Sequence, residues 1–187
     1  MARLPYVNPA ETAPTVREAL ESLPAQLNIF RMLANSETTF RPFLRLGTAI
    51  LASRTFDPKL RELVILQVGK LSGGEYEWVQ HVPIAKALGA SEAQVAALET
   101  GSLDDACFDA RERAVLRFAT EALRNVKASH ASFEELARHL NPGQIVELLM
   151  IVGFYRTIAM LTESTEIEID GPIGMAIVEA SGAERSR

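Results

Sequence analysis

The chain has 187 residues, of which 48% are hydrophobic and 23% are charged, a composition typical of a soluble globular protein. The formal net charge of −5, with no long run of Lys or Arg, argues against a nucleic-acid surface and an anionic membrane partner. Because no apolar run reaches about 18 residues and the first residues lack a signal core, we expect a cytoplasmic protein without a spanning helix. A single cysteine, Cys107, excludes an internal disulfide.

The first third of the chain predicts an irregular arm followed by short helices. Residues 1–14 contain several prolines and favour an arm without regular structure. Residues 15–23 and 25–35 predict two short amphipathic helices. Ser36 can cap a longer helix that tolerates Pro42 if the proline falls in its first turns.

The stretch from Phe56 to Leu98 has the clearest helix boundaries. Asp57 is a good N-cap, and the next residue, a proline, suits the first helical position. Two glycines at 73–74 end this helix, and a second helix runs from there to Gly89, which suits a left-handed C-cap. A third helix begins at Ser91.

The last third predicts three more helices and an extended tail. Asp109 caps a long helix with one apolar stripe, Ser132 begins a short helix, and residues 143–161 form a helix that is apolar almost all round. Such a helix suits the centre of a fold or a subunit interface. Residues 165–172 look extended and could pack on a neighbouring subunit.

Together these patterns predict an all-α, single-domain bundle of about eight or nine helices. The predicted organisation is an arm at 1–14, a helical domain at 15–165 and a tail at 166–187.

The best chemical signal is the pair Glu77 and His81, which lie four residues apart and project from one helix face. Histidine can accept a proton near neutral pH, and a nearby carboxylate can orient it. Tyr76 and Trp78 beside the pair make the wall partly apolar, and Pro83 leaves a backbone carbonyl free one turn earlier. The alternative is an ordinary surface pair.

Glu62, on the preceding helix, could join this pair or could be an exposed carboxylate that pairs with Lys59 or Arg61. Glu62, Glu77 and His81 together have suitable ligand types for a metal, but they lack a dedicated spacing such as H-E-x-x-H, so we expect no metal.

Two further residues have less specific signals. Arg156 lies on the apolar last helix, where an arginine needs an anionic partner. This partner is either a structural glutamate or a substrate carboxylate. Cys107 is expected to be a small buried filler, although a redox role is conceivable if its thiolate were stabilised.

One set of residues is specific enough to indicate a family; it comprises RELVIL at 61–66, EYEW at 75–78, His81, Ala85 and Gly89, and more loosely Gly153, Tyr155 and Arg156. In these residues the chain resembles the carboxymuconolactone decarboxylase family, which includes the alkylhydroperoxidase AhpD. The resemblance implies an all-α fold that assembles into dimers, trimers or hexamers.

The resemblance also separates two chemistries. The peroxidase branch uses a C-x-x-C pair, whose positions fall here on Gly74 and Glu77, so a disulfide cycle has no thiols at this site. The branch that lacks this motif has E-x-x-x-H instead. By resemblance to that branch, His81 is the general acid/base, Glu77 orients it, and Glu62 holds or relays the proton, without metal or organic cofactor.

The resulting expectation is a cofactor-free lyase that acts on a small carboxylated or lactone metabolite, as in aromatic catabolism. We expect substrate contacts from Tyr76, Trp78, Tyr155 and Arg156. The alternatives are a thiol peroxidase that relies on Cys107 and a non-catalytic oligomer that binds a ligand. In each case we expect a homo-oligomer.

Overall fold

The computed structural model describes residues 1–171, so most of the predicted tail lies outside the described part of the chain. This part contains nine α-helices, a short 3-10 turn at Pro9–Glu11 and no strand. The prediction of an all-α fold with eight or nine helices is therefore confirmed. The helices are α1 (Pro14–Glu21), α2 (Asn28–Leu33), α3 (Glu37–Ala52), α4 (Pro58–Ser72), α5 (Glu75–Ala87), α6 (Glu92–Thr100), α7 (Ala110–Asn125), α8 (His130–Ala137) and α9 (Pro142–Thr165).

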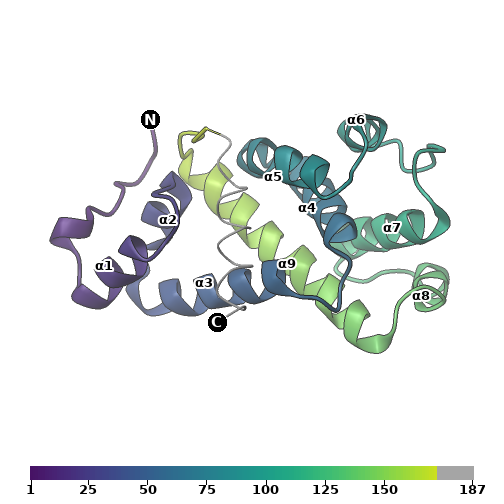
Figure 1. Ribbon diagram of the computed structural model, residues 1–187, viewed down its shortest axis with the longest axis horizontal. Coiled ribbons are helices and arrows are strands. Elements are labelled where there is room, and N and C mark those ends of the chain that lie inside the picture. The colour runs from purple at the N-terminus through teal and green to yellow at the C-terminus, as the bar shows by residue number, and fades with distance from the viewer. Residues whose placement is uncertain (172–187) are drawn as a thin grey trace.

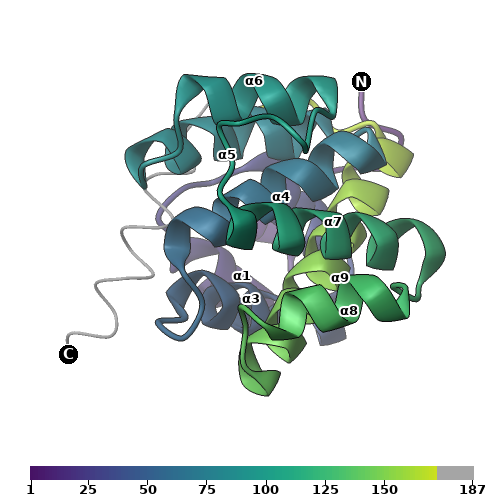
Figure 2. The ribbon, with the colours of Figure 1, turned by 90° about the vertical axis from the view of Figure 1, so that its right-hand side faces the viewer.

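Helix α9 separates two groups of helices (Figure 1): α1, α2 and α3 lie on one side of it, and α4 to α8 lie on the other. Helix α4 is the centre of the second group. It packs against α5, α6, α7 and α9, and Figure 2 shows α6, α4, α7 and α8 in succession across this half. Every residue from Leu60 to Gly69 is buried as a result. Two charged residues of α4, Arg61 and Glu62, are therefore inside the protein.

The predicted caps account for several helix starts. The Asp57 carboxylate accepts a hydrogen bond from the backbone N–H of Leu60 at 2.8 Å. Such a cap is worth about 1 kcal/mol. Three later helices begin with reciprocal capping boxes, in which the third helical residue bonds back to the cap; the pairs are Ser91 with Gln94, Asp109 with Glu112, and Asn141 with Gln144.

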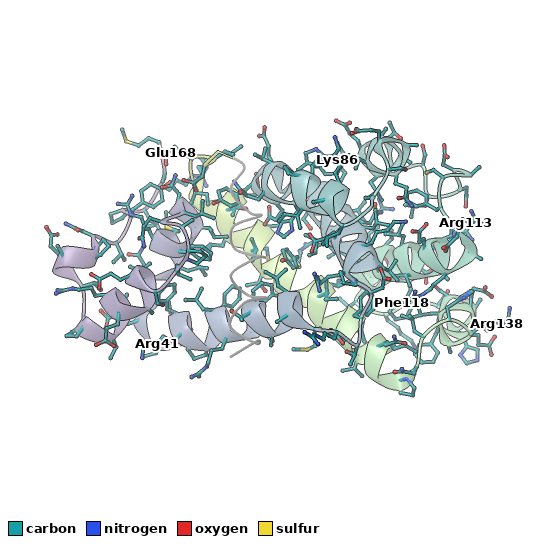
Figure 3. All side chains as sticks on the ribbon, in the orientation of Figure 1. Arg41, Lys86, Arg113, Phe118, Arg138 and Glu168 are labelled. Carbon is teal, nitrogen blue, oxygen red and sulfur yellow. The ribbon has the colours of Figure 1, made fainter. Side chains whose placement is uncertain are left out.

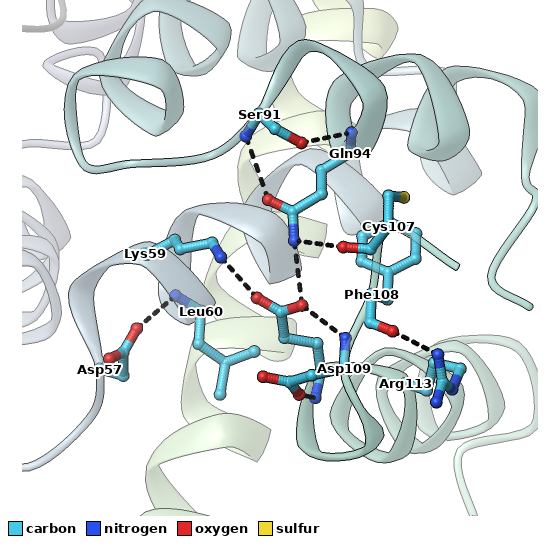
Figure 4. Close-up of polar contacts among 10 residues, drawn as sticks. Asp57, Lys59, Leu60, Ser91, Gln94, Cys107, Phe108, Asp109 and Arg113 are labelled. Atoms are coloured by element: carbon cyan, nitrogen blue, oxygen red, sulfur yellow. Dashed lines mark hydrogen bonds and ion pairs between the residues drawn. The ribbon is translucent and has the colours of Figure 1, made fainter. Parts of the chain in front are cut away.

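Two of these capping boxes contact each other (Figure 4). The Gln94 side chain donates to the Glu112 carboxylate at 2.9 Å and to the Cys107 carbonyl at 3.2 Å. The same carboxylate accepts from the backbone N–H of Asp109 and forms an ion pair with Lys59 at 2.7 Å. This buried polar network fixes the starts of α6 and α7 to α4.

Helix α2 begins three residues later than predicted, because its cap comes from a distant part of the chain. Leu27 stands at the N-cap in extended conformation and has no side-chain cap. Instead, the Asp170 carboxylate accepts a hydrogen bond from the backbone N–H of Asn28 at 2.8 Å. Helix α8 begins two residues earlier than predicted, because Ser129 rather than a later serine caps it.

The described part of the tail packs on its own chain. Ile167 is buried among residues that include Leu27 and Ile29, and the Glu168 carboxylate accepts hydrogen bonds from Ala2 and Tyr6 of the arm (Figure 3). The tail therefore joins the arm to α2, and it does so beside α5.

Helix α9 is the one helix of the described chain that is long and apolar enough to cross a membrane, with 24 residues and a mean hydropathy of 1.7 over its best window. Half of that window is buried inside the protein, as in a core helix. The other side is exposed and contains Val146, Leu149, Met150 and Met160.

Candidate functional site

A cavity of about 550 Å3 lies between the first three helices and the pair α5 and α9. Its walls are mostly apolar, and they include aromatic rings from both sides, such as Phe43 on α3 and Phe154 on α9, which stack with ring centroids 4.4 Å apart. The Phe154 ring also leaves no room for a side chain at Gly47, because an added Cβ would lie 2.8 Å from this ring. A mainly apolar cavity with a few polar groups is typical of a small-molecule site.

Helix α5 supplies four polar side chains of this cavity. Tyr76, Glu77, Gln80 and His81 all line it, since positions separated by three or four residues share a helix face. The structure thus places the predicted pair Glu77 and His81 in a cavity and not on the protein surface.

The hydrogen-bond partner of His81 is Glu62. The Nδ1 atom of His81 lies 2.8 Å from the Glu62 carboxylate, which is 0% exposed. A carboxylate only accepts, so Nδ1 carries the proton and Nε2 is the free base. The prediction that Glu77 orients the histidine is therefore wrong. Helix α4 packs along α5, and this packing brings the Glu62 carboxylate within hydrogen-bond distance of the His81 ring.

Arg61 contacts the other oxygen of Glu62, with its Nε atom at 3.2 Å, and it is itself 2% exposed. The alternative that Glu62 is an exposed carboxylate is therefore wrong, although its pairing with Arg61 is real. A buried carboxylate needs such a counter-charge. The ring of Tyr155 packs edge-on to His81 with centroids 5.1 Å apart, and it excludes water from that side.

Glu77 has a different environment. It is 1% exposed, and beyond its own backbone N–H its carboxyl oxygens have no hydrogen-bond partner among the described residues. Burial raises the pKa of this carboxyl to about 7; the nearby Glu163 adds to the rise, and His81 opposes it. Gly74 makes room for it, because a Cβ there would collide with the Glu77 carboxyl.

The two predicted tyrosines line the cavity. The Tyr76 hydroxyl donates a hydrogen bond to Asp170 at 2.7 Å, and burial with this bond raises its pKa. Burial also raises the pKa of Tyr155, to which the Glu62 carboxylate adds. Both hydroxyls therefore stay protonated near neutral pH.

Two predicted contacts lie elsewhere. Trp78 is half-buried against the core away from the cavity, with Lys70 Nζ 5.7 Å from its ring centre. It follows Tyr76 by two positions, which on a helix points it to the opposite side. Arg156 follows Tyr155 by one position and is exposed on α9, outside the cavity lining. Neither residue is placed to hold a ligand in this cavity.

Sequence reasoning missed two arginines that do line the cavity, Arg41 and Arg45 on α3. The sequence could have indicated them, because Arg41 and Arg45 are four residues apart, Thr48 follows three residues later, and residues at these spacings share a helix face. Arg41 lies near the start of α3 (Figure 3) and pairs with Glu18 at 3.3 Å.

Two other expectations concern metals and thiols. Within residues 1–171, no three or more His, Cys, Asp or Glu side chains are grouped so that they could hold a metal ion. Cys107 lies in the connector before α7, outside the cavity lining, and partial burial with the nearby Asp105 raises the pKa of its thiol.

The described chain is thus an all-α fold in which the buried Glu62 carboxylate bonds His81 at the wall of an apolar cavity. The model of the Carboxymuconolactone decarboxylase family matches residues 37–121, which span α3 to most of α7. No curated protein matches the sequence.

Solved structures show the same fold at low identity. The chain is similar to an uncharacterized peroxidase-related protein with an alkylhydroperoxidase AhpD core from Ralstonia eutropha JMP134 (19% identity, 90% of this chain and 92% of that chain, TM-score 0.77). A peroxidase-related protein from Silicibacter sp. TM1040 has 18% identity over 90% and 92% of the two chains, with a TM-score of 0.73. A debrominase in complex with 2,3,4-tribromopyrrole has 18% identity over 98% and 95%, with a TM-score of 0.71.

Proposed function

We propose that this protein is a cofactor-free lyase that uses His81 as a general acid/base on a small carboxylated or lactone metabolite. The observation that carries the proposal is the 2.8 Å contact between the buried Glu62 carboxylate and Nδ1 of His81, whose side chain lines an apolar cavity. The match to the carboxymuconolactone decarboxylase family model over residues 37–121 supports lactone decarboxylation, and Gly74 and Glu77, which stand in place of the two cysteines of C-x-x-C, disfavour peroxidase chemistry.

The proposed step is a decarboxylation. The bond to the carboxylate carbon breaks, carbon dioxide leaves, and the bonding electrons stay on the substrate as an enolate conjugated with the lactone carbonyl. His81, which first takes a proton at Nε2 from water, gives that proton to the substrate carbon, while the Nδ1 proton stays in the hydrogen bond to Glu62. General acid catalysis of this kind contributes about 10²- to 10⁴-fold in rate.

Glu62 supports this step by stabilising the imidazolium form of His81 and by fixing the orientation of the ring. Arg61 offsets the charge of Glu62, so the pair can exist inside the protein. The edge of Tyr155 and the apolar walls keep water from the intermediate, which strengthens electrostatic interactions there.

A thiol peroxidase has less support. Gly74 and Glu77 offer no thiol beside His81, and Cys107 lies outside the cavity lining with a raised thiol pKa, so its thiolate is disfavoured. The descriptions of the neighbouring structures as peroxidase-related or as a debrominase belong to those proteins.

The test is carbon dioxide release from 4-carboxymuconolactone and a few related lactone acids, with the wild type beside His81→Ala and Cys107→Ser. We expect release that disappears in His81→Ala and persists in Cys107→Ser. A folded His81→Ala variant with an unchanged rate would contradict the proposal. No release from any of these acids by the wild type would favour the non-catalytic binding alternative.

A further inference from the structure

The polar groups of the cavity are divided between its depth and its rim. His81 and Tyr155 are only 9% and 3% exposed, so they lie deep in the cavity wall. Arg45 and Thr48 on α3 line the same cavity, yet both residues are exposed. A residue that lines a cavity and is also exposed to solvent lies where the cavity opens. The cavity therefore has the histidine inside and an arginine with a threonine at its rim.

Arg45 has no partner of its own in the described chain. No residue of 1–171 forms a hydrogen bond or an ion pair with its side chain, whereas Arg41, one turn earlier, pairs with Glu18 at 3.3 Å. The Thr48 hydroxyl, three positions after Arg45, is likewise without a partner among the described residues. Arg41 and Arg45 are the only Lys or Arg residues in the described lining. The rim therefore offers one unpaired positive charge.

We propose that Arg45 binds a carboxylate that the substrate keeps through the reaction. The inference rests on the proposed function, and it adds that the substrate has two acidic groups, of which one leaves as carbon dioxide. The planar guanidinium matches the two oxygens of a carboxylate, and the Thr48 hydroxyl can donate to the same group. Arg45 is therefore a residue that determines which acids enter the cavity and how they are oriented in it.

The carboxylate at Arg45 is not the one that leaves. In the proposed step His81 protonates the carbon from which carbon dioxide departs, so the leaving carboxylate lies on the α5 side of the cavity. Arg45 belongs to the wall formed by α3. An ion pair with the departing group would also oppose the reaction, because it would stabilise a charge that the group loses in the transition state. The retained carboxylate is therefore the group that Arg45 holds.

Aromatic rings line the space between these two ends. Phe43 on α3 stacks on Phe154, and Phe154 meets Tyr155 edge-on with ring centroids 5.4 Å apart. Tyr155 in turn meets the ring of His81. A planar, unsaturated body packs well along such a row of rings. We therefore expect a planar ring compound with one acidic group near His81 and a second one at Arg45.

The experiment measures binding of two matched probe pairs, benzoate against benzamide and phenylacetate against phenylacetamide, by ligand-observed NMR titration at pH 8. The members of each pair have nearly the same shape and differ by one negative charge. We expect the wild type to bind each anion about fivefold more tightly than its amide, as for a charge-assisted pair that stays in contact with water. Arg45→Gln should lose this preference. Arg54→Gln, which removes an exposed arginine outside the cavity lining, should keep it.

Both variants should remain folded, because each replaces an exposed arginine with a polar residue that also suits helices. A wild type that binds acid and amide equally, a preference that survives in Arg45→Gln, an equal loss in Arg54→Gln, or no binding of any probe at millimolar concentration would each overturn the inference. A preference that disappears in His81→Ala would also overturn it, since the anion would then lie at the histidine. The probes undergo no reaction, so carbon dioxide release that depends on His81 would still support the proposed function in these cases.

Salt gives a second readout. An ion pair at an exposed arginine is screened by dissolved salt, whereas apolar contacts of the ring are not weakened in this way. The preference for benzoate over benzamide should therefore decrease as sodium chloride is raised, and the affinity for benzamide should not. A preference that does not change with salt would contradict the pairing with Arg45.

Discussion

The Nδ1 atom of His81 and the carboxylate of Glu62 lie 2.8 Å apart, although 19 positions separate the two residues in the chain. Helices α4 and α5 bring them together, and Arg61 completes a buried row of three charged or ionisable side chains. The histidine therefore holds a proton on Nδ1, and its Nε2 atom is free to accept one.

Glu62→Gln should reduce turnover of any substrate that depends on His81 by about 10²-fold or more, because an amide cannot stabilise the imidazolium as a carboxylate does. The double variant with His81→Ala should be no slower than His81→Ala alone, since the two residues act as one unit. The measurement is kcat for the two single variants and the double variant. Independent, multiplicative losses would show that Glu62 acts apart from His81.

The pKa of Glu77 makes a prediction about stability. An acid whose pKa rises on folding, here from 4.5 to about 7, holds its proton more tightly in the folded chain. Its contribution to stability is therefore complete below pH 4.5, decreases as the pH rises, and is lost above about pH 7. Relative to Glu77→Gln, the wild type should lose roughly 3 kcal/mol of unfolding free energy over this interval.

Urea unfolding at pH 5 and pH 8 checks this prediction. Comparison with Glu77→Gln removes the contribution of other acids, which titrate alike in both proteins. A difference between the two proteins that does not change with pH would mean that the Glu77 carboxyl is not held protonated by burial.

The sequence predicted the helices with strong local signals and missed what depends on distant contacts. Asp57, Ser91 and Asp109 cap their helices as predicted, because a cap bonds to its own next turn. The predicted start of α2 was wrong, because the residue that caps this helix, Asp170, is 142 positions away in the chain.

The candidate site shows the same division. The positions of Glu77 and His81 on one helix face followed from their spacing, which is local. The choice of Glu62 as the partner of His81 depends on how α4 packs along α5, and the face that Arg156 occupies depends on which side of α9 is covered. Neither packing relationship is encoded in a short motif.

Asp170 is expected to hold one wall of the cavity in place. It bonds to the backbone of Asn28 and to the hydroxyl of Tyr76, and both α2 and Tyr76 contribute to the cavity lining. Asp170→Ala should lower the unfolding free energy by about 1–3 kcal/mol, because it removes a cap and leaves a buried hydroxyl without its acceptor. Asp105→Ala, an exposed acid outside the cavity lining, is the control. Equal stability of the two variants would contradict this role.

We propose that the protein forms a homo-oligomer through the exposed side of α9. Val146, Leu149, Met150 and Met160 lie on this side at spacings that form one apolar stripe. Exposed stripes of this kind commonly mark protein interfaces. Light scattering at micromolar concentration should give a mass above that of one chain, and Leu149→Glu with Met160→Glu should reduce it. A wild-type monomer under these conditions would contradict the proposal.

The last prediction concerns Gly74 and Glu77, whose side-chain positions compete for one space. Gly74→Ala alone should destabilise the protein by about 1–3 kcal/mol, because the new Cβ would collide with the Glu77 carboxyl. The same change in a Glu77→Ala background should cost much less, since the carboxyl is gone and alanine is a good helix-terminal residue with no positive φ required there. Urea unfolding of the four proteins measures the coupling energy, which should exceed about 1 kcal/mol for residues in contact. Additive effects would mean that the Glu77 carboxyl does not occupy the space beside Gly74.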